Sequence, residues 1–228
     1  MNKKYLITAS LYGAYSYYMH TDFEEYGDKA EEIEEKARQD WLDCLNKVKK
    51  PANEILQRGI NFETAVFELT QGIERIEGIN AETTAHGVTK LPASNLLDDA
   101  EYATAQEIAE KVKGGLWQET VCKTIGNYVF YGKADIIRGN TIFDIKRVSK
   151  YDLGKYLKSI QHLLYMECSG IDNFKYVISD GAYVYVEDYH RDANTRQNLL
   201  ARTEQMVSFI RGNEEFNAAF EKNWHSKY

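Results

Sequence analysis

Two aspartates and a lysine in neighbouring segments have the residue types and spacing of a metal-binding site, in which the carboxylates would be the ligands. Asp135 precedes the pair Gly139-Asn140, and Asp144 and Lys146 follow it. Both flanking runs are rich in Val, Ile, Tyr and Phe, and a Gly-Asn pair between such runs is typical of a two-residue hairpin turn. This turn predicts a register with Asp135 opposite Asp144. Lys146 shares the face of Asp144 because side chains alternate along a strand.

Two carboxylates that face each other in a sheet destabilise it unless something compensates their charge. Unit charges about 5 Å apart repel by roughly 3 kcal/mol at an effective dielectric of about 20. A divalent cation would compensate, and oxygen ligands suit Mg²⁺ or Mn²⁺. Two other interpretations stay open: both aspartates lie on a solvated face, or Lys146 forms a simple ion pair with Asp144.

Three motifs in this order resemble the PD-(D/E)xK nuclease superfamily, and most closely its RecB-like branch with the QxxxY motif. They are Gly132-Lys-Ala-Asp135, Asp144-Ile145-Lys146 and Gln161-His-Leu-Leu-Tyr165. The resemblance covers roughly residues 58–189, and one usual feature, a proline before the first aspartate, is replaced by Ala134. A D-x-K triplet alone is common by chance, whereas the ordered set is more specific. The resemblance implies a mixed α/β fold with a restriction-endonuclease-like core and flanking helices.

The resemblance also implies an acidic residue on a helix before the sheet, and Glu63 fits this position. It implies that Glu63, Asp135, Asp144 and the carbonyl of Ile145 hold one or two Mg²⁺ or Mn²⁺ ions. Many relatives carry a metal-binding His where this chain has Phe62, so the site here must use carboxylates and carbonyls. The alternative for Glu63 is an ordinary exposed helix residue.

Gln161 and Tyr165 are four residues apart on a predicted helix, so they share a face. The resemblance implies that they steady the scissile strand or Lys146, and the alternative is that they lie at the edge of the core. Basic residues near this helix would contact phosphates or lie on a solvated face. They are Arg147, Lys150, Lys155 and Lys158.

Hydrophobic periodicity and turn residues predict helices, then a three-stranded meander, then a helix, a hairpin and further helices. The predicted helices cover residues 24–47, 61–69, 98–113, 152–168 and 192–211, with a shorter one before the C-terminus. The predicted strands cover residues 116–125, 128–137, 141–148, 174–179 and 182–189, and residues 72–92 are predicted to form a loop. This order favours one domain over residues 1–228, with a helical region at about residues 22–50 as an appendage.

The formal net charge of −7 lacks the basic balance that points directly to nucleic acid. Residues 146–158, however, contain five basic residues and one acidic residue. Residues 22–35 contain eight acidic residues and one lysine. This acidic segment is typical of a solvated helix face, and it would also suit a protein partner.

Cys44, Cys122 and Cys168 are isolated, so the sequence predicts neither a disulfide framework nor an iron–sulfur cluster. A reducing compartment follows most simply, and we expect a cytoplasmic protein. No stretch approaches the length of a membrane span. His86, His162 and His190 form no catalytic arrangement, so we expect core or surface roles for them.

By resemblance, the activity is that of a metal-dependent deoxyribonuclease that leaves a 5′-phosphate and a 3′-hydroxyl. A stand-alone exonuclease of phage or bacterial recombination or repair fits the size of the chain. The alternative is a catalytically silent member of the fold that binds nucleic acid or a protein partner. The intact Asp135, Asp144 and Lys146 set argues against it, because a silent site would be free to lose any of the three.

Overall fold

A twisted mixed sheet of six strands forms the centre of the computed structural model, which describes residues 3–77 and 91–226. The strand order is β1-β3-β4-β5-β6, and β2 pairs with the other edge of β3. The strands are β1 (Tyr5–Ile7), β2 (Leu116–Ile125), β3 (Tyr128–Arg138), β4 (Thr141–Arg147), β5 (Asn173–Ser179) and β6 (Val184–His190). The predicted mixed α/β class is therefore confirmed, and the predicted strands all form.

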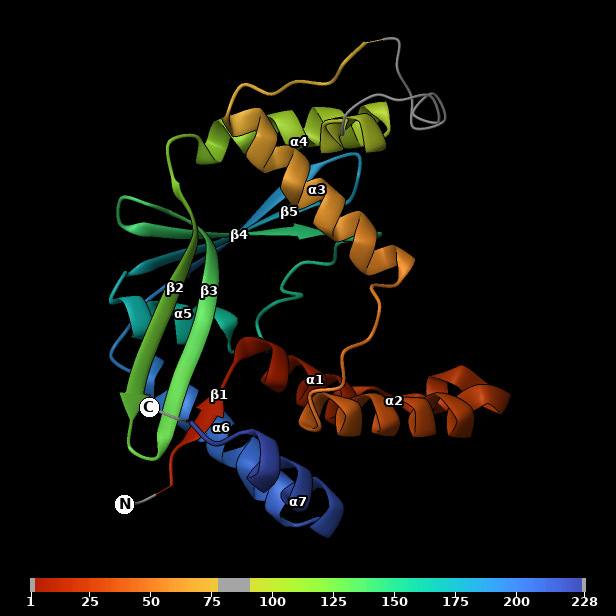
Figure 1. Ribbon diagram of the computed structural model, residues 1–228, viewed down its shortest axis with the longest axis vertical. Helices are drawn as coiled ribbons and strands as arrows, with labels where there is room; N and C mark the ends of the chain where they lie inside the picture. The colour runs from red at the N-terminus through yellow and green to blue at the C-terminus, as the bar shows by residue number, and fades with distance from the viewer. Residues whose placement is uncertain (1–2, 78–90, 227–228) are drawn as a thin grey trace.

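Helices cover both faces of this sheet. They are α1 (Ala9–His20), α2 (Ala30–Leu45), α3 (Glu54–Thr70), α4 (Asp99–Val112), α5 (Gln161–Ser169), α6 (Thr195–Arg211) and α7 (Glu214–Asn223), with short 3₁₀ helices at Phe23–Lys29 and Ala93–Leu96. Figure 1 shows α3 and α4 above the sheet and α1, α5, α6 and α7 below it. None of the helices in the described part of the chain is long and apolar enough to cross a membrane.

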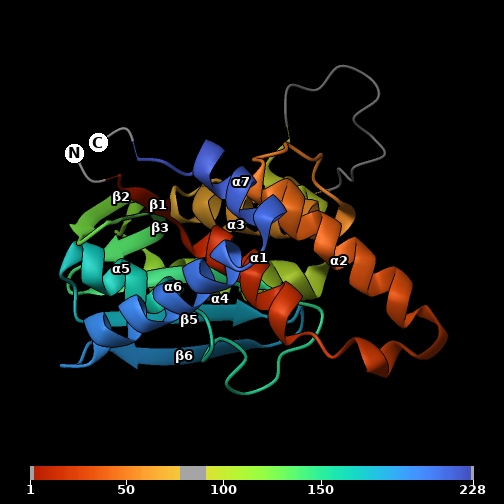
Figure 2. The ribbon, with the colours of Figure 1, turned by 90° about the horizontal axis from the view of Figure 1, so that it is seen from below.

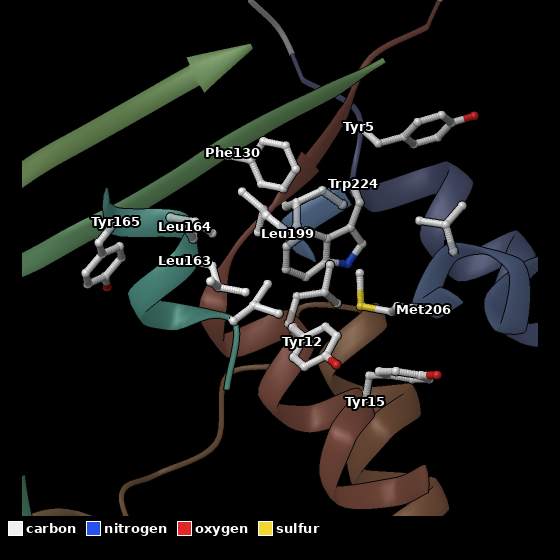
Figure 3. Packing of buried hydrophobic residues seen from close by; sticks show 14 of the residues in the cluster. Tyr5, Tyr12, Tyr15, Phe130, Leu163, Leu164, Tyr165, Leu199, Met206 and Trp224 are labelled. Atoms are coloured by element: carbon white, nitrogen blue, oxygen red, sulfur yellow. The ribbon is translucent and has the colours of Figure 1, made fainter. Parts of the chain in front are cut away.

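Each face has its own apolar core. On one face, Phe62 and Val66 of α3 and Ile108 of α4 pack on Ile136 and Ile145 of the sheet. The other cluster is larger and joins α1, α2, α5, α6 and α7 to β3 and β5. Figure 2 shows α5 and α6 crossing this second face, and Figure 3 shows side chains from several of these helices meeting around Trp224. The two cores position α3 and α5 on opposite sides of β4.

The hairpin between β3 and β4 has the predicted turn, and the three residue pairs next to the turn have the predicted register. Gly139 has a φ of 57°, and Arg138 pairs with Thr141. Ile137 with Ile142 and Ile136 with Phe143 follow. The ladder ends there, so the predicted fourth pair, Asp135 with Asp144, is not part of it.

The helix predicted over residues 152–168 is wrong in its first half, because α5 begins at Gln161. Gly154 adopts a left-handed φ of 79°, and residues 153–158 form turns instead. On a helix over these residues Leu153 and Leu157 would share an apolar face with Leu164, but they are 93% and 61% exposed. Tyr156 does pack on the sheet, stacked on Tyr176 at 4.4 Å between ring centroids.

The N-terminal third also departs from the prediction of helix. Tyr5–Ile7 forms a strand parallel to the start of β3, and Thr8 caps α1 by accepting from the Leu11 N–H. Gly27, with a φ of 56°, kinks the 3₁₀ stretch Phe23–Lys29 that precedes α2 within the predicted helix 24–47. The predicted loop has no helix or strand over residues 72–77, and residues 78–90, with His86, lie outside the described residues.

Candidate active site

Asp144 lies near the middle of β4 and is 1% exposed, so its carboxylate depends on protein groups for compensation. Lys146, two residues along the same strand, places its Nζ 2.5 Å from Oδ2. From α5, the Gln161 side-chain amide donates to Oδ1 at 2.5 Å. Apart from the ion pair with Lys146, Oδ2 has no hydrogen-bond partner among the described residues. The strand and the helix thus converge on one buried carboxylate.

Asp135 lies on β3 where the hairpin ladder ends. Its Oδ2 accepts a hydrogen bond from the Ile145 N–H at 3.0 Å. A regular antiparallel ladder would place Ile145 opposite Ala134 and direct this N–H to a backbone carbonyl. The Asp135 carboxylate replaces that carbonyl as the acceptor of the Ile145 N–H, which explains why the fourth predicted pair is missing from the ladder. The two aspartates nevertheless remain close enough to act on each other electrostatically.

The charges around this pair do not balance. Burial raises the pKa of Asp135 well above its usual value, and the nearby charges of Asp144 and Glu63 raise it further. Burial also raises the pKa of Asp144, against the opposing effect of Lys146. Burial lowers the pKa of Lys146, but Asp144 and Asp135 outweigh it and the net pKa is raised. Lys146 is therefore a stable cation that faces three carboxyl groups.

Glu63 approaches the two aspartates from α3, which covers one face of the sheet. Its helix starts at Glu54 because Asn53 accepts from the Leu56 N–H at 2.8 Å. The Glu63 side chain is half-buried, and Gln118 of β2 donates to its Oε1 at 2.7 Å. Burial, and then the charge of Asp144, raise the pKa of Glu63. Glu63 and the two aspartates are therefore close enough for their charges to act on one another.

The pair Gln161 and Tyr165 lies on the inner face of α5. Besides contacting Asp144, the Gln161 amide lies 3.5 Å from the Tyr165 hydroxyl, which itself donates to the Lys133 carbonyl at 3.0 Å. A Cβ on Gly132 would overlap the Tyr165 ring, so a glycine is required at this position. The helix is thereby held against both β3 and β4.

The predicted phosphate-binding residues differ in what surrounds them. Arg147 is enclosed, with its side chain 10% exposed, and it donates to the buried Glu101 at 2.7 Å and to the Val148 carbonyl at 2.6 Å. The three lysines are exposed on the segment between β4 and α5. They are Lys150, which pairs with Asp152 at 3.1 Å, Lys155 and Lys158.

Two clefts border the carboxylates. One cleft of about 470 Å³ is lined by Lys146, Gln161 and Tyr165, together with Lys133 and the start of α1. A second cleft, of about 480 Å³, is lined by Ile60, Glu63, Thr64, Phe67, Trp117 and Gln118. Neither Gln118 nor the start of α1 stands out in the sequence, because both approach the site only through the packing of distant elements.

The donor groups fit a divalent cation in their chemistry. Glu63, Asp135 and Asp144 supply hard oxygen ligands with excess negative charge, and Oδ2 of Asp144 is buried without a hydrogen bond. Among the described residues, no three His, Cys, Asp or Glu side chains are arranged so that they could hold a metal ion as they stand. Lys146 occupies the Oδ2 of Asp144 that a cation would use, so binding requires this contact to rearrange.

No protein-family model and no curated protein sequence matches the chain. Solved structures with a similar fold have low sequence identity. LHK-Exo in complex with dAMP is 14% identical, with a TM-score of 0.46 over 97% of this chain and 91% of that chain. An alkaline exonuclease, LHK-Exo from Laribacter hongkongensis, is 13% identical, with a TM-score of 0.44 over 95% and 90%. A protein from Eubacterium rectale is 15% identical, with a TM-score of 0.48 over 96% and 83%.

Proposed function

We propose that this chain is a metal-dependent nuclease that hydrolyses phosphodiester bonds in DNA. The observation that carries the proposal is the environment of Asp144. This buried carboxylate lies beside Asp135 and contacts Lys146 and Gln161, and both of these residues line a cleft. A structural ion pair alone would need neither the second aspartate nor Glu63, whose like charges destabilise the site.

The residues that would hold the ion are Glu63, Asp135 and Asp144, with the carbonyl of Ile145. When bound there, Mg²⁺ or Mn²⁺ lowers the pKa of a coordinated water and polarises a phosphoryl oxygen. The backbone of Ile145 already lies beside Asp135, since its N–H donates to that carboxylate. We expect this bond to keep Asp135 oriented while its other oxygen faces the ion.

Lys146 supplies the positive charge of the mechanism. Its raised pKa keeps the ammonium protonated at neutral pH, so it serves as a charge and hydrogen-bond donor and not as a base. It lines the 470 Å³ cleft, where it would stabilise the charge that develops on the phosphorus oxygens or orient the attacking water. Gln161 donates to Oδ1 of Asp144 and so fixes this carboxylate beside Lys146.

We further propose that the enzyme is an exonuclease, that it leaves a 5′-phosphate and a 3′-hydroxyl, and that it serves phage or bacterial recombination or repair. The exposed lysines between β4 and α5 would contact phosphates of the substrate. Arg147 is left out of this role because it is enclosed by its pairing with Glu101. The acidic segment 22–35 remains the candidate surface for a protein partner.

The test is digestion of end-labelled linear DNA and closed circular DNA in Mg²⁺, Mn²⁺ or EDTA. Cleavage of the linear substrate from its ends, dependent on metal and lost in Asp144→Asn, is the expected result. Cleavage of the closed circle would indicate an endonuclease. Full activity in EDTA would overturn metal dependence. DNA binding without cleavage under every condition would support a catalytically silent protein.

A further inference from the structure

We infer that Gln118 is a positioning residue that holds Glu63 at the carboxylate centre, an inference that rests on the proposed function. Gln118 belongs to β2, which contributes no acidic group to the site. Its side-chain amide donates to Oε1 of Glu63 at 2.7 Å. This contact joins a strand at the edge of the sheet to a residue on α3.

The backbone of Gln118 is strained. Its φ is +58°, and Lys47 is the other non-glycine residue with a positive φ in the described part of the chain. Lys47 lies in the turn after α2, where such a conformation is ordinary. Gln118 lies inside a strand, where an L side chain rarely adopts it. Backbone strain of this kind persists where the surrounding structure over-determines it, and it is frequent at functional sites.

The strained residue faces the centre directly. Trp117 pairs with Ile136 and Glu119 pairs with Ala134, so the missing partner of Gln118 in the ladder is Asp135. The interruption of β2 and the early end of the β3–β4 ladder therefore occur at the same residue of β3. Both irregularities leave residues near the carboxylates outside the regular strand pairing.

The choice of an amide has a chemical consequence. Glu63 lies near Asp144, whose charge repels it, so some group must hold its side chain in place. A lysine or arginine would hold it but would also neutralise the site and compete with a cation. The Gln118 amide is neutral, engages Oε1 and leaves Oε2 for the ion. Trp117 and Phe67 pack edge-to-face at 5.0 Å beside it, which anchors β2 to α3.

Gln118→Gly and Gln118→Asn both remove the side-chain contact with Glu63 while they ease the backbone strain. Glycine accepts a positive φ without strain, and asparagine tolerates it better than most residues while its amide is too short to reach Glu63. Both variants should melt at or above the temperature of the wild type. Both should bind Mn²⁺ about tenfold more weakly in calorimetric titrations without DNA, as expected for the loss of one hydrogen bond to a charged ligand. Lys47→Gly is the matched control, because it places a glycine at the other non-glycine position of positive φ in the described residues without touching the site.

A double-mutant cycle with Glu63→Gln identifies the route of the effect. If Gln118 acts through Glu63, adding Gln118→Gly to Glu63→Gln should weaken Mn²⁺ binding no further. Unchanged Mn²⁺ affinity in both Gln118 variants, while Glu63→Gln lowers it, would overturn this inference and leave the proposed function intact. Additive losses in the double variant would also overturn it. Absence of Mn²⁺ binding by the wild type would overturn both proposals together.

Discussion

At the scale of single residues, the site is defined by one lysine placed among three carboxyl groups. Asp144 is buried and held by Lys146 and Gln161, and Asp135 and Glu63 add negative charge that these contacts do not cancel. A protein that needed only stability would gain by replacing such a cluster with apolar residues. The excess charge is therefore the feature that points to a bound cation and a reaction.

Lys146→Ala should separate catalysis from binding. Lys146 is not a metal ligand, and its removal frees Oδ2 of Asp144, so metal affinity should be retained or rise, whereas DNA affinity in Ca²⁺ should fall modestly. Single-turnover cleavage should fall by orders of magnitude, because a charge directed at the transition state contributes about 3 kcal/mol or more. Lys133→Ala, which removes another charge from the same cleft, should retain most of the rate. Near-normal cleavage by Lys146→Ala would revive the interpretation of a structural ion pair.

Asp135→Asn should stabilise the metal-free protein while abolishing cleavage. The folded-state pKa of Asp135 lies above its usual value of 3.8, so the folded protein binds this proton more tightly than the unfolded chain does. The charged carboxylate then costs stability increasingly as pH rises from 3.8 through the folded-state pKa. The gain in melting temperature in EDTA should be large at pH 8 and shrink toward pH 4. A marked loss of stability at pH 8 would instead identify Asp135 as a structural acceptor for Ile145.

His162 should make the protein sensitive to acid. Its ring is buried and stacked on Tyr189 at 4.0 Å, and burial lowers its pKa to about 3. Below about pH 6.5 the unfolded chain takes up this proton first, so stability is lost as pH falls from about 6.5 toward 3. The loss should approach about 1.4 kcal/mol per pH unit in denaturant unfolding, and His162→Phe should remove it. The exposed His190→Gln serves as the control, and an equal acid sensitivity of His162→Phe would contradict the assignment.

At the scale of elements, the segment between β4 and α5 differs most from its prediction. Apolar spacing predicted a helix over residues 152–168, but Gly154 takes a left-handed conformation and the helix begins at Gln161. The physical reason is that apolar residues three or four positions apart favour a helix only weakly. Gly154 adopts a left-handed φ without steric cost and so favours a turn. As a result, the lysines of this segment lie on an exposed loop beside the cleft, not along a helix face.

Removal of these lysine charges should reduce the salt dependence of DNA binding. Each lysine that contacts a phosphate contributes about 0.9 to the slope of log affinity against log salt on duplex DNA. The triple variant Lys150→Ala, Lys155→Ala, Lys158→Ala should therefore lower the slope in magnitude by up to about 3, measured by fluorescence anisotropy in Ca²⁺. The matched control replaces three exposed lysines on and after α2 and on α7, namely Lys36, Lys49 and Lys222. An equal slope in the two triple variants would exclude a direct role for the loop.

At the scale of the whole molecule, the end of the chain closes the larger core. The Trp224 indole donates to the Leu45 carbonyl at 2.9 Å, and its own carbonyl accepts from the Leu6 N–H at 2.8 Å. Figure 3 shows this ring among Tyr12 and other side chains of the cluster. The strand β1 and the helix α2 are thus linked through a residue more than 170 positions away from either.

Trp224→Ala should destabilise the protein by about 3–5 kcal/mol, as expected for a large buried aromatic residue. Urea unfolding would measure this, and the exposed Lys222→Ala on the preceding helix should change little. Because Trp224 lines neither cleft beside the carboxylates, the folded fraction should keep its Mn²⁺ affinity. A loss below about 1 kcal/mol would show that β1 and α2 are held without the C-terminal contact.

The sequence by itself determined the local features: the mixed α/β class, the Gly139-Asn140 hairpin, and the placement of Asp144 and Lys146 on one face. These follow from turn chemistry and strand alternation, which act over a few residues and so are readable without a partner. The strand Tyr5–Ile7 was missed because it is three residues long and gains its stability from pairing with β3, more than 120 residues away. Tertiary structure alone decided that Gln161 holds Asp144, that Gln118 contacts Glu63, and that Arg147 is enclosed by Glu101. It also placed the strained Gln118 opposite Asp135. Such contacts join elements far apart in the chain, and burial in two separate cores, not any local pattern, sets their distances.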